Sequence, residues 1–171
     1  MSSCNKPTQM KHLITVVLGL LLVSTVRAKE IKTEILISAS TEKVWAIFSD
    51  FKNYPKWNPF IKSLTGEVKV GEKINVTIQP YDSKPMSFKP KVLVFETNKE
   101  MRWIGRLLFG GLFDGKHQFE IIDNHNGTVT FKQSEVFKGI LMPFFSKKKM
   151  ENTRKGYEAM NQQLKELAEQ K

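Results

Sequence analysis

The hydrophobic pattern of this chain changes near Ser146 from a period of two residues to a period of three or four. Between residues 61 and 139, short runs of alternating apolar and polar residues are separated by turn residues such as Asn126-Gly127. Such runs predict a meander of about six antiparallel strands. From Ser146 onward, apolar side chains recur at helical spacing over about six turns, which predicts one long amphipathic helix. The apolar faces of a sheet and a helix are most simply buried against each other.

The remaining elements follow from shorter patterns. Residues 31–37 alternate and predict a first strand. Ser38–Thr41 offers hydroxyl groups for a helix N-cap, and the apolar residues that follow it at helical spacing predict a short amphipathic helix. Residues 53–60, which include two prolines, predict a second short helical turn. The clearest later strands are 73–79, 86–95, 101–107, 115–122 and 128–138. We therefore expect an α+β domain with a curved antiparallel sheet of six to seven strands, two short helices and one long C-terminal helix.

The first 28 residues have the layout of a secretory signal peptide. Lys6 and Lys11 precede an uncharged apolar run over residues 13–26, and small residues at Val26 and Ala28 suit a cleavage site. The run is shorter than the roughly 20 residues that cross a bilayer, so cleavage is favoured over an N-terminal membrane anchor, and a buried helix of the domain is less favoured still. We expect residues 1–28 to be this leader and residues 29–171 to be the folded domain. The domain is expected to be exported (periplasmic or secreted) after cleavage near Ala28, or to be anchored to the membrane through residues 13–26.

Charge and cysteine content narrow the functional classes. The net charge is +10 at pH 7, and only three of the excess positive charges, Lys6, Lys11 and Arg27, lie in the leader. A basic domain favours anionic surfaces and also promotes solubility. Nucleic acid is an unfavoured partner, because no groove-entering motif and no aromatics interleaved with the basic residues are present in the sequence. The single cysteine is Cys4, so residues 29–171 have no disulfide or thiol chemistry.

Four segments, taken in order, resemble the START-like superfamily, also called SRPBCC. They are Ala39–Trp45, Asp50-Phe51 with Tyr54–Pro59, Gly111–Phe119 and Glu135–Pro143. The likeness spans almost all of the chain after the leader, and the bacterial polyketide cyclase/dehydrase and lipid-transport branch resembles it most. This resemblance implies a helix-grip fold, in which a curved sheet closes over the C-terminal helix around an apolar cavity. It implies no single activity, because the fold hosts binding, transfer and several chemistries.

The resemblance also implies a ligand-binding cavity between the sheet and the last helix. We expect its apolar walls to be formed by Phe88, Val92, Met101, Trp103, Phe119, Phe131, Tyr157, Met160 and Leu164, a set that ordinary core packing predicts equally well. The expected ligand is an apolar small molecule such as a lipid, an isoprenoid or a polyketide, and no cofactor is expected.

Polar residues also face this interior. Strict alternation places His117 on the same side of its strand as Phe119, and Gln133 and Glu135 on the same side as Phe131. His117 and Glu135 are candidates for a general acid/base pair or for a hydrogen-bonding anchor of a ligand oxygen. The alternative is that both are satisfied near the mouth of the barrel. No sequence motif indicates a metal site, a nucleophilic serine or a phosphate-binding loop.

The segment Ile140–Phe145 runs directly into Lys147, Lys148 and Lys149. Positive charge at the start of a helix opposes the macrodipole, so helix stability does not explain these lysines. A membrane-docking lip would insert Phe144 and Phe145 and place the lysines among anionic headgroups. Alternatively, the phenylalanines pack inward and the lysines are solvated. An anionic membrane surface is thus a second expected partner, while the oligomeric state stays open.

These observations favour a non-catalytic protein that binds or transports a hydrophobic small molecule. His117 and Glu135 would orient its polar end, and an opening near 107–112 or 140–145 would admit it. The alternative is a cyclase or dehydratase that uses His117 as its acid/base and Glu135 as the partner.

Overall fold

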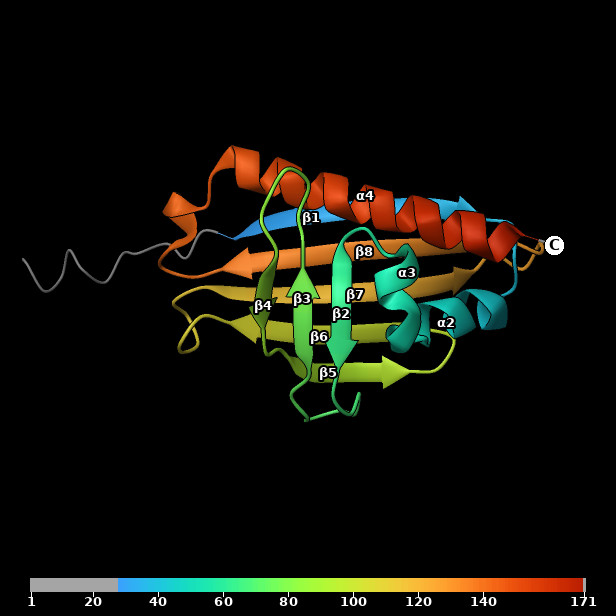
Figure 1. Ribbon diagram of the computed structural model, residues 1–171, viewed down its shortest axis with the longest axis horizontal. Helices are drawn as coiled ribbons and strands as arrows, with labels where there is room; N and C mark the ends of the chain where they lie inside the picture. The colour runs from blue at the N-terminus through green and yellow to red at the C-terminus, as the bar shows by residue number, and fades with distance from the viewer. Residues whose placement is uncertain (1–27, 171) are drawn as a thin grey trace, which may run out of the picture.

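The structure, a computed structural model, describes residues 28–170 (Figure 1). The expected signal peptide or anchor lies outside these residues apart from Ala28, so it stays a prediction. Within 28–170 no helix combines the length and the apolar character that a membrane crossing requires.

The elements occur in the expected order. They are β1 (Lys29–Ile37), α2 (Thr41–Ser49), the 3-10 helix η1 (Phe51–Asn53), α3 (Tyr54–Trp57), β2 (Ile61–Thr65), β3 (Asn75–Ile78), β4 (Met86–Phe88), β5 (Lys91–Glu96), β6 (Glu100–Arg106), β7 (Asp114–Asp123), β8 (Val129–Lys138), the 3-10 helix η2 (Met142–Phe144) and α4 (Lys147–Glu169). The α+β fold with two short α-helices and one long C-terminal helix is confirmed.

The strands form two antiparallel sheets, where a single sheet of six to seven strands was expected. Five strands have the order β1-β8-β7-β6-β5, and three have the order β2-β3-β4. The expected strand 86–95 is broken at Pro90, which has no N–H to donate to a sheet. Backbone hydrogen bonds still join the sheets at this corner, from Gly71 N to Val92 O and from Ile74 N to Pro90 O. The smaller sheet is therefore connected to the large sheet at its β5 edge.

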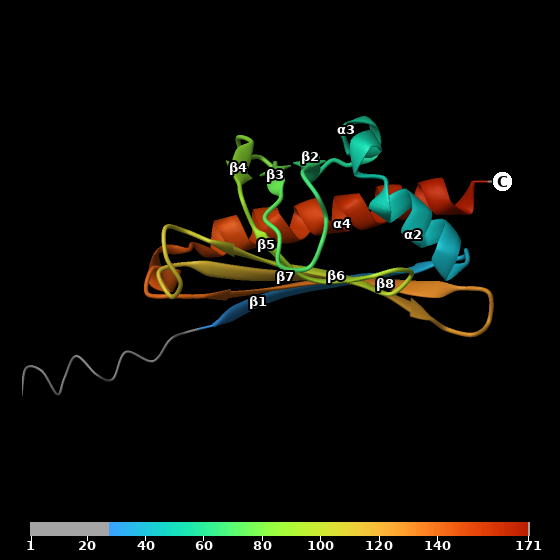
Figure 2. The same cartoon turned by 90° about the horizontal axis from the view of Figure 1, so that it is seen from below.

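The long helix and the smaller sheet lie on the same side of the five-stranded sheet (Figure 2). Along β7, the side chains on this inner side are buried at Gly115, His117, Phe119 and Ile121, whereas their neighbours are more exposed. The predicted inward direction of His117 is thus confirmed. The inner side of the large sheet, α2 and α4 enclose the hydrophobic core.

The predicted starts of the helices that follow Ser40 and Ser146, and the predicted hairpin, are confirmed. Ser40 Oγ accepts a hydrogen bond from Lys43 N at 3.3 Å, and Ser146 Oγ accepts one from Lys149 N at 3.2 Å, so both serines are N-caps. β7 and β8 form the hairpin expected around Asn126-Gly127. Its loop runs from residue 124 to 128 and is longer than a two-residue turn.

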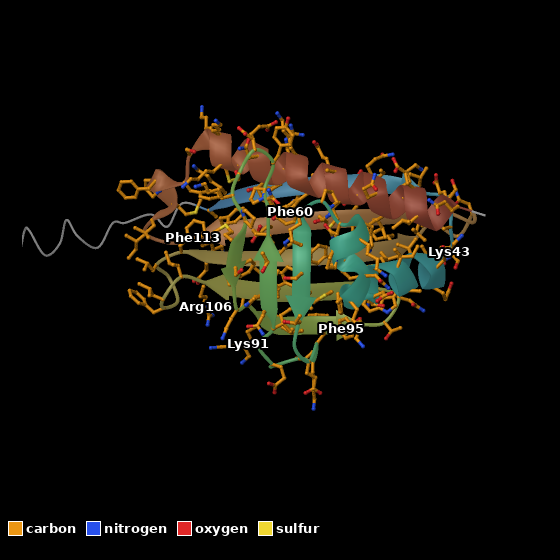
Figure 3. All side chains as sticks on the ribbon, in the orientation of Figure 1. Lys43, Phe60, Lys91, Phe95, Arg106 and Phe113 are labelled. Carbon is orange, nitrogen blue, oxygen red and sulfur yellow. The ribbon has the colours of Figure 1, made fainter. Side chains whose placement is uncertain are left out.

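Gly156 allows α4 to approach the smaller sheet closely. A Cβ at this position would lie 2.5 Å from Cδ2 of Phe60, the residue just before β2. Figure 3 labels Phe60 beside the helix, and its ring meets the Tyr157 ring edge-on at 4.9 Å. The helix and the smaller sheet therefore meet where α4 carries no side chain.

Gly156→Ala is expected to lower the melting temperature. Alanine gains about 1 kcal/mol in helix propensity, but overpacking against the Phe60 ring costs about 1 to 3 kcal/mol. Thermal unfolding followed by circular dichroism measures the balance. The double variant Gly156→Ala with Phe60→Leu is the control, since it relieves the clash and should recover part of the loss. A higher melting temperature in Gly156→Ala alone would contradict this account.

Candidate functional site

The candidate site is an aromatic cluster with His117 at its centre, between β7 and α4. The His117 ring stacks on Phe119 with a centroid distance of 4.0 Å, and it lies 4.7 Å from the Tyr157 ring and 5.4 Å from the Trp103 ring. His117, Phe119, Trp103 and Tyr157 are all buried. The sequence pattern predicted each of these residues, and the structure brings them together.

A chain of polar contacts crosses this cluster. His117 Nε2 lies 3.3 Å from Gln133 Oε1, Gln133 Nε2 donates to Asn161 Oδ1 and to Tyr157 O, and Asn161 Nδ2 donates to Thr33 Oγ1 at 3.1 Å. It links β7, β8, α4 and β1. Asn161 and Thr33 were missed, although Asn161 follows Tyr157 by four residues on the apolar side of α4 and is 2% exposed. The position of Asn161 on the apolar side of the helix could have indicated that its side chain is buried.

Glu135 pairs with Tyr157, whose hydroxyl donates to Glu135 Oε2. The carboxylate lies over Gly115 on the neighbouring strand, where a Cβ would be only 2.6 Å from Glu135 Oε1. Burial raises the pKa of Glu135 to about 7, although the hydrogen bond from Tyr157 acts in the opposite direction. Burial and the Glu135 charge raise the pKa of Tyr157 well above its ordinary value. Glu135 therefore exchanges its proton near neutral pH.

His117 and Glu135 are opposite each other in the pairing of β7 with β8, but their side chains have different hydrogen-bond partners. Burial lowers the pKa of His117 to about 3, and the contact with Gln133 offsets this only in part. His117 is therefore neutral at pH 7. Of the two candidate acid/base residues, Glu135 has the pKa closer to neutrality.

The expected cavity walls are part of the hydrophobic core. Val92, Met101, Phe131, Met160 and Leu164 are buried together with the aromatic cluster. Phe88 is half-buried and lies with its ring 3.2 Å from the position a Cβ on Gly105 would take. Phe48 of α2, which was not among the expected residues, also belongs here, since its ring lies 5.1 Å from Phe119 and 5.7 Å from Phe131.

Two hollows of the described chain lie outside this core. One of about 370 Å³ is lined by residues 49–52 and 64–66. The other, of about 150 Å³, lies on the outer side of the large sheet between Ile104, Asp114, Lys116, Val136 and Lys138. Beneath α4 the aromatic rings pack against one another at centroid distances of 4.0 to 4.9 Å, so a ligand among them would have to separate these side chains.

The described residues 28–170 contain no group of three histidine, cysteine or acidic side chains arranged to hold a metal ion. Asp114 instead lies beside Arg106, with 3.9 Å between the carboxylate and the guanidinium, and His125 lies at the β7–β8 turn near Asp123.

The residues expected at a membrane divide into two groups. Phe144 is 79% exposed, and Lys147, Lys148 and Lys149 are also exposed. Phe145 is half-buried, with its ring 5.2 Å from Phe113 and 5.1 Å from Phe137. One of the two phenylalanines therefore faces solvent, and the other packs against the end of the sheet.

The sequence was compared with models of known protein families and with curated proteins. Residues 28–169 match the family described as polyketide cyclase/dehydrase and lipid transport. None of the curated proteins matches the chain.

Solved structures with a similar fold have low sequence identity. A norcoclaurine synthase point mutant from Thalictrum flavum, in complex with a transition-state analogue, is 16% identical with a TM-score of 0.60, over 84% of this chain and 96% of that one. A Chromobacterium violaceum protein is 19% identical with a TM-score of 0.63, over 83% and 98%. A START superfamily protein from Mycobacterium smegmatis is 17% identical with a TM-score of 0.63, over 82% and 97%. Since the family match spans almost all the described residues, the protein belongs to the polyketide cyclase/dehydrase and lipid transport family of the START-like (SRPBCC) superfamily.

Proposed function

We propose that this domain binds or transports a hydrophobic small molecule beneath α4, and that Glu135 and Tyr157 hold the polar end of that molecule. The family and its fold are those of hydrophobic ligand-binding proteins. The observation that carries the proposal is the Glu135–Tyr157 hydrogen bond, in which a partly buried carboxylate meets the hydroxyl of a tyrosine that belongs to the aromatic cluster. Apolar burial contributes roughly 25 cal/mol per Å², so the aromatic walls would supply most of the affinity.

The smaller sheet is the element best suited to move aside for a ligand. Its inner side chains belong to the shared hydrophobic core, but in the described chain its backbone is joined to the large sheet only by hydrogen bonds between residues 71–74 and 90–92, and to α4 by the one from Tyr81 N to Asn152 O. The large sheet and α4 are joined far more firmly through the network of Gln133 and Asn161. Opening of β2-β3-β4 would separate Phe60 from Tyr157 and expose the aromatic cluster.

Proton-transfer catalysis is the second candidate function, and the pKa of Glu135 favours it. A general acid or base works best when its pKa is close to the working pH, and the Glu135 value of about 7 meets this condition. A cyclase or dehydratase built on this site would use Glu135 as the acid/base. Neutral His117 would act as a hydrogen-bond donor or acceptor toward the substrate.

Native mass spectrometry with lipid extraction, on the full chain purified from its own host, tests the proposal. We expect an apolar molecule in stoichiometric amount. Glu135→Gln should retain it with less than about a tenfold loss of affinity, because the amide can still accept from Tyr157 and neutral hydrogen bonds contribute only about 1 kcal/mol. Glu120→Gln, the same change on the outer face of the large sheet, in β7, is the matched control.

The two functions give different results with the same variant. In an enzyme, Glu135→Gln would reduce turnover by about 100-fold or more while leaving substrate binding in place. A folded native protein that carries no apolar molecule, and binds none when one is added, would refute the carrier proposal.

A further inference from the structure

We propose that one end of the domain docks onto a bilayer surface with anionic headgroups. The docking surface, which we call the apolar rim, consists of Leu107, Leu108, Phe109, Ile140 and Phe144. The first three residues lie in the β6–β7 loop, and the last two lie between β8 and α4. Sequence patterning predicted only the second of these loops as a membrane contact.

The two loops form one structural unit. Ile140 N donates to Gly111 O at 3.0 Å, and Leu141 N donates to Leu112 O at 3.0 Å. Beneath them, the rings of Phe113, Phe137 and Phe145 pack at centroid distances of 5.1 to 5.8 Å. Figure 3 labels Phe113 at this end of the sheet. The rim is thus supported from below and needs no refolding to meet a surface.

The rim presents apolar side chains to solvent. Leu108 is 86% exposed and Phe144 is 79% exposed, while Leu107, Phe109 and Ile140 are also exposed. Leu108 has a φ of +61°, which is an unusual conformation for a bulky side chain. Contiguous exposed apolar residues of this kind mark interaction sites.

Positive charge surrounds the rim and identifies the partner. Residues 106–113 and 139–149 contain four basic side chains, Arg106, Lys147, Lys148 and Lys149, and no acidic one, although Arg106 lies 3.9 Å from Asp114. Lys148 lies 3.8 Å from Asp82, which leaves Lys147 and Lys149 free of any ion pair among the described residues. Apolar side chains bordered by lysines fit the boundary between acyl chains and anionic headgroups, where each lysine contributes about 1 kcal/mol.

The chain enters the domain at this same end. Lys29 pairs with Phe137, and its Nζ donates to Phe145 O at 2.8 Å, so β1 begins beside η2 (Figures 1 and 2). In the sequence, only Arg27 and Ala28 separate β1 from the uncharged apolar run 13–26. Two residues span at most about 7 Å. A bilayer that holds this run would therefore lie against the rim.

Fluorescent labelling of the full chain distinguishes rim docking from binding through the leader. In a Cys4→Ser background, Phe144→Cys and Leu36→Cys each receive an environment-sensitive fluorophore. Leu36 is 55% exposed near the other end of β1 and is the matched control. With vesicles of equal parts phosphatidylcholine and phosphatidylglycerol, we expect the label at 144 to shift to shorter wavelengths and to be shielded several-fold from aqueous iodide. The label at 36 should not change.

Charge reversal tests the electrostatic part. Lys147→Glu with Lys149→Glu should lower the ratio of shielded to exposed label at 144 by about tenfold or more, given the contribution per lysine. Lys52→Glu with Lys56→Glu alters the net charge equally and should have a smaller effect. An unshielded label at 144, or equal shielding at 36, would overturn the proposal. So would shielding at 144 that needs no vesicles and grows with protein concentration, since a second copy would then cover the rim.

Discussion

Glu135→Gln is expected to change the free energy of unfolding more favourably at pH 8 than at pH 4.5, and the difference between the two pH values should be up to about 3 kcal/mol. The Glu135 carboxyl has a pKa of about 7 in the folded protein, against an ordinary value of 4.5. Between these values the unfolded chain loses the proton first, so this group makes stability fall as pH rises from about 4.5 to about 7. Glutamine can accept from Tyr157 and does not ionise, so the fall should disappear.

His117→Gln is expected to have the opposite effect on the pH dependence. The pKa of His117 is about 3 in the folded protein, against 6.5 ordinarily, so the unfolded chain takes up a proton first as pH falls. This group therefore makes stability fall as pH decreases from about 6.5 to about 3. The two contributions nearly cancel between about pH 4.5 and pH 6.5 in the unmodified protein, which should show a flat profile there.

Urea unfolding at half-unit steps from about pH 4 to pH 8 measures both effects. Glu135→Gln should leave a profile that rises with pH up to about 6.5, and His117→Gln should leave one that falls up to about 7. Parallel profiles for the two variants would show that burial of the carboxyl and imidazole groups does not govern their ionisation.

Gly139→Ala is expected to lower the free energy of unfolding by about 3 kcal/mol or more. Gly139 has a φ of +138°, a conformation that costs other residues about 1 to 3 kcal/mol. A Cβ there would also lie 2.4 Å from Leu112 O and 2.9 Å from Phe113 Cα, so the two loops of the apolar rim would be forced apart. Urea unfolding measures the loss, and hydrogen exchange at Ile140 and Leu141 should accelerate because their acceptors, Gly111 O and Leu112 O, would move away.

Gly127→Ala separates the clash from backbone strain. Gly127 also has a positive φ, of +82°, but no atom lies within 4 Å of the position its Cβ would take. This variant should lose only about 1 kcal/mol, the ordinary cost of a left-handed residue. Equal losses at 127 and 139 would mean that the contact of Gly139 with Leu112 contributes nothing.

The inward faces of β7 and β8 were predictable because alternation is a local property of a strand. Once Phe119 and Phe131 were placed inward, the directions of His117, Gln133 and Glu135 followed. The N-cap within residues 38–41 and the start of the last helix near Ser146 were predictable for the same reason, since a helix start depends on residues within one turn.

Features that depend on the docking of distant segments could not be predicted in this way. Tyr157 meets Glu135, and Asn161 meets Gln133, only because of how α4 is positioned along the sheet. The spacing of residues within the sequence does not indicate that position. The bend at Pro90 likewise depends on hydrogen bonds between residues 71–74 and 90–92. Leu108 and Phe109 were not predicted for the rim, because nothing local indicates that their loop lies beside Ile140.

The pairing of β1 with β8 has a consequence for the order in which the chain folds. The first strand of the domain bonds to the last one over its whole length, from Lys29 with Phe137 to Ile37 with Val129. Long-range pairing of this kind makes folding slow, because a large loop must close before the contacts form. During synthesis, β1 therefore has no partner until β8 begins to emerge at Val129, and its full length is matched only after Phe137. The pairs β5–β6 and β6–β7 can form earlier, but the large sheet cannot be completed before β8 is available.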